Sequence, residues 1–289
     1  MTKSRFLVFQ ICILVLLLIF AAIVGGTAFS DIYTKRETQE FVLKRELNRA
    51  IVTGNYAAVE QMISEHPKLV NEPLAKNASE YAETVNDDTP LIAAGADIKL
   101  VRLLVDNGAD INAVTPISHR YPLTSVLASG AEERIDVAWF YIGKGADLFA
   151  HDYVNGSLPY ALLACEGIVQ SNLQNSVVEL MDYLYKKGVP FDMPELPSSE
   201  YYNLLGLAAE NNYYGVIEYF AENKVYDFNM RITDDGKTAL MIAAKHGNYG
   251  ATNYLVYYGA REHFKDDYRR TAYDYAKISK DQRTIEYLS

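Results

Sequence analysis

The residue types that most often carry catalysis or metal binding are scattered through this sequence. Its five histidines are His66, His119, His151, His246 and His263. They form neither an HExxH motif nor a pair spaced by four residues, so we expect no metal site and no cofactor. Cys165 follows an apolar stretch without a neighbouring histidine, which favours a buried thiol over a nucleophile. The GxSxG and SxxK motifs are also missing, and these observations predict a protein that is not an enzyme.

One fragment resembles the end of a phosphate-binding loop. Asp235-Gly236-Lys237-Thr238 carries the glycine, lysine and threonine, but Arg231 stands where the first glycine of that loop belongs. We therefore interpret the fragment as a turn whose threonine begins a helix. Asn155-Gly156-Ser157 and Asn77-Ala78-Ser79 match glycosylation acceptors, and Asn155-Gly156 is also typical of a turn.

Composition and charge limit the class of partner. The 289 residues include 27 Lys and Arg against 37 Asp and Glu, for a net charge of −10. Lys3 and Arg5 are the only charged residues before Asp31, so the rest of the chain carries −12. An acidic chain repels phosphate backbones, and we expect no nucleic-acid partner. A hydrophobic content of 49% predicts a folded chain, and two cysteines exclude a disulfide framework.

Helical segments with matching residues recur from Phe41 to the end of the chain. Two units are clearest: Thr89-Pro90-Leu91-Ile92-Ala93-Ala94, continuing to Gly108-Ala109-Asp110, and Thr238-Ala239-Leu240-Met241-Ile242-Ala243-Ala244, continuing to Gly259-Ala260. These units resemble the ankyrin repeat, a unit of about 33 residues with a β-turn and two helices. Paired alanines let neighbouring helices lie close together, threonine can begin the first helix, and glycine can end the second.

Weaker copies bring the number of repeats to seven. The matching small or apolar residues are Ala50, Ala94, Val126, Leu163, Ala208, Ala243 and Ala276, spaced by 44, 32, 37, 45, 35 and 33 residues. The longer intervals place insertions at 72–88, 131–135 and 166–178. In the fifth repeat, Asn212 and Lys224 replace the expected glycines. The resemblance therefore implies an all-α ankyrin-repeat solenoid of about seven helix-turn-helix repeats with short β-turn fingers, over residues 41–289.

The resemblance also implies protein binding through a concave surface formed by the turn tips and the first helices. The matching positions are Asp88, Arg120 and Tyr202 in the turns, followed by Glu210, Lys237, Lys245, His246, Tyr268 and Arg270. Mixed charge with interleaved tyrosine suits this use, because tyrosine offers a large contact area at low rotamer entropy. Three further tyrosines match positions where the second helices bury leucine, namely Tyr219, Tyr254 and Tyr287.

The N-terminal residues predict a membrane segment. A short basic flank at residues 1–5 precedes an apolar run at residues 6–24, and about 20 such residues cross a bilayer as a helix. A linker at residues 25–40 would follow. Ala28-Phe29-Ser30 resembles a signal cleavage site, so a secreted protein is the alternative. Basic residues nearly balance across the segment, and the signal-anchor arrangement favours the extracytoplasmic side for the repeats.

Together these features predict a single-pass, membrane-anchored ankyrin-repeat scaffold that binds another protein. Two further classes stay open: an inhibitor or immunity protein that covers a basic enzyme, and a hydrolase built on the loop insertions.

Overall fold

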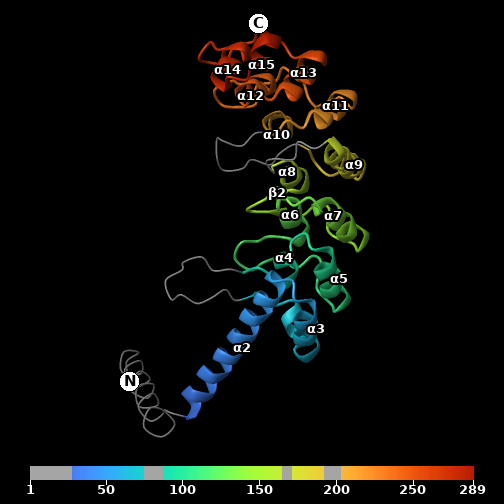
Figure 1. Cartoon of the computed structure of the whole chain (residues 1–289), viewed down its shortest axis with the longest axis vertical. Helices are drawn as coiled ribbons and strands as arrows, with labels where there is room; N and C mark the ends of the chain where they lie inside the picture. Colours follow the sequence, from blue (N-terminus) through green and yellow to red (C-terminus); the bar gives the residue numbers. More distant parts are fainter. Residues whose placement is uncertain (1–27, 75–86, 165–170, 192–202) are drawn as a thin grey trace, which may run out of the picture.

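Helix-turn-helix pairs follow one another along the chain and stack into an elongated solenoid (Figure 1). The structure, a computed structural model, describes residues 28–74, 87–164, 171–191 and 203–289. In these ranges the first helices of the pairs are α2 (Ala28–Val52), α4 (Pro90–Ala93), α6 (Pro122–Leu127), α8 (Leu158–Leu163), α10 (Leu204–Glu210), α12 (Ala239–Lys245) and α14 (Ala272–Ser279). The second helices are α3 (Tyr56–Glu65), α5 (Ile98–Asp106), α7 (Arg134–Gly143), α9 (Ser171–Lys186), α11 (Tyr214–Glu222), α13 (Tyr249–Tyr257) and α15 (Gln282–Leu288). The prediction of seven repeats is thus confirmed.

Three short elements complete the described secondary structure. The 3₁₀ helix η1 (Pro67–Val70) follows α3, and the strands β1 (His151–Asp152) and β2 (Gly156–Ser157) form a hairpin before α8. In that hairpin His151 pairs with Ser157, and Asp152 pairs with Gly156. The turn predicted at Asn155-Gly156 is therefore present.

The helix ends follow local sequence signals. Thr271 and Asp274 form a capping box at the start of α14, and Thr89 accepts a hydrogen bond from the Ile92 amide at the start of α4. Thr238 occupies the corresponding position before α12, but its side chain makes no capping hydrogen bond, contrary to our expectation.

The turns after the helices need a left-handed backbone conformation. Gly108 has a φ of 92° and Gly259 a φ of 97°. In the fifth repeat, Asn212 and Lys224 adopt the same region, with φ values of 57° and 53°. These are the two turn positions where the repeat pattern has glycine and this sequence has another residue.

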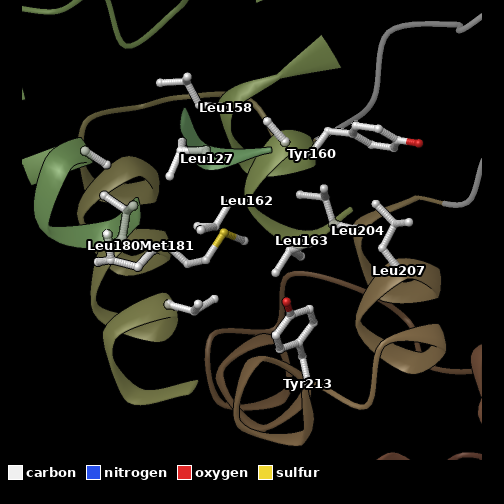
Figure 2. Packing of buried hydrophobic residues seen from close by; sticks show 14 of the residues in the cluster. Leu127, Leu158, Tyr160, Leu162, Leu163, Leu180, Met181, Leu204, Leu207 and Tyr213 are labelled. Atoms are coloured by element: carbon white, nitrogen blue, oxygen red, sulfur yellow. The ribbon is translucent and has the colours of Figure 1, made fainter. Parts of the chain in front are cut away.

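Consecutive repeats bury their apolar faces against each other. Each first helix contacts the first helix of the next repeat, and each second helix contacts the next second helix. In α12 the residues from Ala239 to Ala244 are all buried, so the paired alanines allow close packing as predicted. Figure 2 shows Leu127 of α6, Leu162 of α8 and Met181 of α9 meeting in one continuous core.

Asparagine side chains link neighbouring repeats at the turns after the second helices. The side-chain amide of each asparagine donates a hydrogen bond to a glycine carbonyl of the next repeat. Its side-chain oxygen accepts a hydrogen bond from the backbone amide two residues after that glycine. The links are Asn71 to Gly108 and Asp110, Asn112 to Gly145 and Asp147, and Asn229 to Gly259 and Arg261. Phe149 takes the place of this asparagine after the third repeat.

The N-terminal part differs from the sequence prediction. Residues 28–40, which we assigned to a linker, belong to the continuous helix α2. Residues 28–52 contain neither glycine nor proline, so nothing in this segment ends a helix. Within the described ranges no helix is both long and apolar enough to span a membrane. The apolar run at residues 6–24, together with Cys165 and Tyr202, lies outside the described residues.

The excess of tyrosine is partly a core feature. Tyr141, Tyr213 and Tyr275 are almost completely buried, and Tyr219 retains only 7% exposure. Tyr254 is half-buried against the core. Tyr287 is 36% exposed, contrary to our expectation, because its neighbour Leu288 takes the buried position.

Candidate partner-binding surface

Loops called fingers connect successive repeats and project away from the second helices (Figure 1). Four fingers are described in full: finger A (112–121), finger B (147–157), finger C (229–238) and finger D (263–271). Most of the residues predicted to bind a partner lie on these fingers or at the ends of the first helices. Their geometry shows which of them are already paired within the chain.

Finger A carries Arg120, one of the residues predicted to bind a partner. The Arg120 guanidinium forms an ion pair with Asp88 and lies 3.9 Å from an Asp87 carboxylate oxygen. Its Nε donates a hydrogen bond of 3.0 Å to Ser118 Oγ. The structure therefore brings together Arg120 and Asp88, each predicted to bind a partner, and the two side chains neutralise each other and fix the finger.

Finger D holds Arg270 in a similar way. The guanidinium contacts the buried Asp266 carboxylate at 3.1 Å and lies 4.6 Å above the Tyr268 ring and 4.8 Å above the Tyr275 ring. Tyr275 Oη donates a 2.6 Å hydrogen bond to the same carboxylate. Burial alone would raise the pKa of Asp266, but these hydrogen bonds outweigh it and lower the pKa. Tyr268 itself remains 67% exposed.

Finger C contacts finger D directly. Lys237 forms an ion pair with Asp235 in its own finger. The Asp267 amide of finger D donates a 3.0 Å hydrogen bond to the Asp235 carbonyl, and Arg231 pairs with the Asp267 carboxylate at 2.6 Å. Gly236 lies at the turn with a φ of 80°, so this segment is the turn that we predicted.

The remaining predicted residues lie at the ends of α10 and α12. Glu210 and His246 approach to 3.5 Å, which makes an ion pair when the histidine is protonated. Lys245 is exposed. The predicted residues thus form pairs along the surface, whereas Lys245 and Tyr268 present their side chains to solvent.

Besides Asp266, sequence reasoning missed two further buried aspartates beneath the finger tips. Asp87 is 3% exposed and accepts hydrogen bonds of 2.7 Å from the Ile117 amide, the Ser118 amide and Ser118 Oγ. Burial opposes ionisation, but these donors outweigh it and lower the pKa of Asp87 to about 2. Asp87 is therefore charged at neutral pH and fastens the tip of finger A to the preceding repeat.

Asp152 has the same role in finger B. It is fully buried and accepts hydrogen bonds from Thr124 Oγ1, the Val154 amide at 2.9 Å and the Asn155 side chain at 3.0 Å. A single sequence gives no signal for this role, because Asp is also common in unsupported turns.

Apolar side chains at the same two tips were also missed. Ile117 is 60% exposed, Tyr153 77% and Val154 62%. His119 joins the two tips, since its ring centroid lies 4.9 Å from that of Tyr153. Large apolar residues at turn positions, where polar residues are usual, were the available sequence signal. We call Ile117, His119, Tyr153 and Val154 the tip patch.

Comparison with protein families agrees with this geometry. A family model described as ankyrin repeats (3 copies) matches residues 163–266 and 205–289, and one described as ankyrin repeats (many copies) matches residues 91–138. Together the matches cover more than half of the chain. The chain belongs to the ankyrin-repeat family. Ankyrin repeats mediate protein–protein interaction, and proteins built from them are typically non-enzymatic binding scaffolds.

Individual relatives of this ankyrin-repeat chain are distant. The Caenorhabditis briggsae ankyrin repeat and KH domain-containing protein CBG24701 is 26% identical over 204 residues. The match covers 69% of this chain but 7% of that protein, so the chain spans only a small fraction of its relative's length.

Solved structures confirm the fold. The human ASB11 ankyrin repeat domain superposes with a TM-score of 0.56 at 19% identity, covering 84% of this chain and 97% of that chain. The Bcl-3 ankyrin repeat domain gives 0.51 at 21% identity, covering 84% and 96%. A complex of the endopeptidase Bd0816 from Bdellovibrio bacteriovorus with immunity protein Bd3460 also gives 0.51, at 23% identity, covering 70% and 97%. At these identities the likeness concerns the fold alone.

In the described ranges no three or more His, Cys, Asp or Glu side chains gather in an arrangement that could hold a metal ion.

Proposed function

We propose that this protein is a scaffold that binds a protein partner through the concave surface formed by its fingers and first helices. The observation that carries the proposal is the internal pairing of the fingers. Because Asp87, Asp152 and Asp266 fasten three finger loops from below, the surface is formed before a partner arrives. A preformed surface loses little conformational entropy on association, so more of the contact energy contributes to affinity.

Tyr268 provides the test of this surface. We would replace Tyr268 with a photo-crosslinking phenylalanine derivative in the full chain, in its native membranes. Tyr257 is the matched control, because it is 78% exposed but lies on the second helix α13. We expect crosslinking to one protein from position 268 and none from position 257. Equal capture at both positions, or a captured protein that does not bind the purified chain saturably, would contradict the proposal.

We further propose that residues 6–24 anchor the scaffold in a membrane, with the repeats on the extracytoplasmic side. The support is the length and apolarity of that run. The full chain should stay with membranes after alkaline carbonate extraction, whereas residues 28–289 should be released. Protease added to sealed vesicles reports the side that the repeats face. Release of both chains would contradict the membrane anchor. In right-side-out vesicles, protection of the repeats from external protease would show that they face the cytoplasm.

A second candidate function is inhibition of a basic enzyme. The net charge of −12 from Asp31 onward favours it, because an acidic surface steers a cationic protein into place. Asp234 is exposed on finger C and, unlike its neighbour Asp235, forms no ion pair with another residue of the described ranges. Asp234→Lys should then slow association with the enzyme at low salt, and an unchanged association rate would exclude this role for the finger.

A further inference from the structure

The tip patch is an exposed apolar surface held in a fixed shape. Ile117, Tyr153 and Val154 each expose 60% or more of their surface, although they come from two different fingers. Soluble surfaces rarely gather large apolar side chains unless they bind something there. The patch therefore needs an occupant.

The tips do not collapse onto the core, because hydrogen bonds hold their backbones outward. Asp87 accepts from the Ile117 amide, and Asp152 accepts from the Val154 amide. The contact between His119 and Tyr153 then fixes one tip against the other. Both apolar tips are thus presented as one rigid surface.

The charges around the patch indicate the chemistry of the occupant. Fingers A and B and the residues directly beneath them contain four carboxylates, Asp87, Asp88, Asp147 and Asp152. Their one basic residue is Arg120, which pairs with Asp88 and lies 3.9 Å from Asp87, so it balances one of the four charges. Asp87 and Asp152 are buried and act on the patch through the field of their charges. The surroundings of the patch are therefore negative, like the chain as a whole.

A second copy of this chain fits poorly. Its charge is also −10, and a two-fold contact at the patch would bring the same carboxylates together. A segment with basic residues would instead gain from the local field while its apolar side chain covers the patch.

We propose that the tip patch is the docking site for a cationic segment of the partner protein, in which an apolar side chain is flanked by Lys or Arg. This inference rests on the proposed function, since it specifies which part of the finger surface carries the affinity and which partner chemistry it accepts. The apolar side chain packs between Ile117 and Tyr153, and the flanking cations face the acidic surroundings.

The test uses the full chain in nanodiscs of zwitterionic lipid and a display library of random peptides, with prior depletion on empty nanodiscs. The enriched peptides are synthesised, and their binding is measured to the wild type, to Tyr153→Ser/Val154→Ser and to Tyr257→Ser. The first variant changes exposed side chains only, and the second is its matched control, since Tyr257 is 78% exposed and Tyr153 77%. Far-UV circular dichroism verifies that both variants are folded.

We expect enriched peptides that contain an apolar residue with flanking Lys or Arg. They should bind the tip variant about 10- to 30-fold more weakly, the loss typical of a central contact, and bind Tyr257→Ser like the wild type. Their affinity should also fall between roughly 50 and 500 mM salt.

Three results would overturn the inference: enrichment of uncharged or acidic peptides, equal binding to the tip variant, or no enriched peptide. The first would still support a finger surface that binds protein. If the tip variant binds equally or no peptide is enriched, crosslinking from position 268 still tests separately whether the finger surface binds a protein.

Discussion

Asp87 illustrates how a single buried carboxylate organises a finger. It accepts three hydrogen bonds from Ile117 and Ser118, although it belongs to the preceding finger. A charge-assisted hydrogen bond to a backbone amide is stronger than a neutral one, so these contacts offset the cost of burying the charge. The tip of finger A therefore depends on a residue about 30 positions earlier in the chain.

The lowered pKa of Asp87 predicts a specific acid sensitivity. Its folded pKa of about 2 lies below the usual 3.8, so the ionised carboxylate stabilises the folded state fully above pH 4. This contribution, roughly 2 kcal/mol, is lost as the pH falls through 2. Asp87→Asn should lower the free energy of unfolding at pH 7 by about 1–3 kcal/mol, since the amide group cannot accept all three bonds equally.

Urea denaturation at a series of pH values would measure both effects. The difference between wild type and Asp87→Asn should shrink on acidification from pH 4 to 2. Asp106→Asn, at an exposed position of α5, is the control and should change the free energy of unfolding little at any pH. A difference between wild type and Asp87→Asn that stays constant with pH would show that the carboxylate charge is unimportant.

Individual site residues were only partly predictable from sequence. The family resemblance pointed to Arg120 and Arg270 as surface positions, and they do lie on fingers. It could not show that Asp88 and Asp266 neutralise them, because such pairs depend on loop geometry rather than on spacing. The sequence placed Lys224 at a glycine position, and the structure confirms the left-handed backbone there.

At the scale of elements, the asparagine links couple one repeat to the next. Asn112 donates to the Gly145 carbonyl at 3.2 Å and accepts from the Asp147 amide at 2.8 Å. Asn112→Ala should therefore destabilise the chain by about 1–2 kcal/mol and raise hydrogen exchange of the Asp147 amide. Asn107→Ala is the control, because among the described residues the Asn107 side chain bonds to Leu103 of its own helix and not to another repeat. If both variants lose the same stability and exchange alike at Asp147, the link between repeats contributes nothing specific.

The order and number of the helices were predictable because each repeat carries its own signals. Paired alanines, turn glycines and Pro after the first-helix start recur from unit to unit, so even weak copies could be placed. The extent of α2 was not predictable from the repeat pattern. Its residues before Phe41 have no counterpart in the other repeats, and helix propensity alone extends it to Ala28.

At the scale of the whole molecule, the main contacts between the described helices join elements of one repeat or of neighbouring repeats. The solenoid's free energy of unfolding should then be the sum of the stabilities of single repeats and of the interfaces between neighbours. A destabilising substitution in one repeat should therefore affect little beyond the adjacent repeats. The first helices differ in size, since α4 has 4 residues and α12 has 7. The second repeat therefore offers its neighbours a smaller contact surface than the sixth.

Two matched substitutions test this local behaviour. Leu104 and Leu255 are the seventh residues of α5 and α13, both helices have nine residues, and both side chains are fully buried. Replacement of either leucine by alanine should lower the free energy of unfolding of its own repeat by about 2–4 kcal/mol. Hydrogen exchange should rise in α3 to α7 for Leu104→Ala and in α11 to α15 for Leu255→Ala, with little change at the far end. A uniform rise along the chain in both variants would show a single cooperative unit, and the finger surface would then form or unfold as a whole.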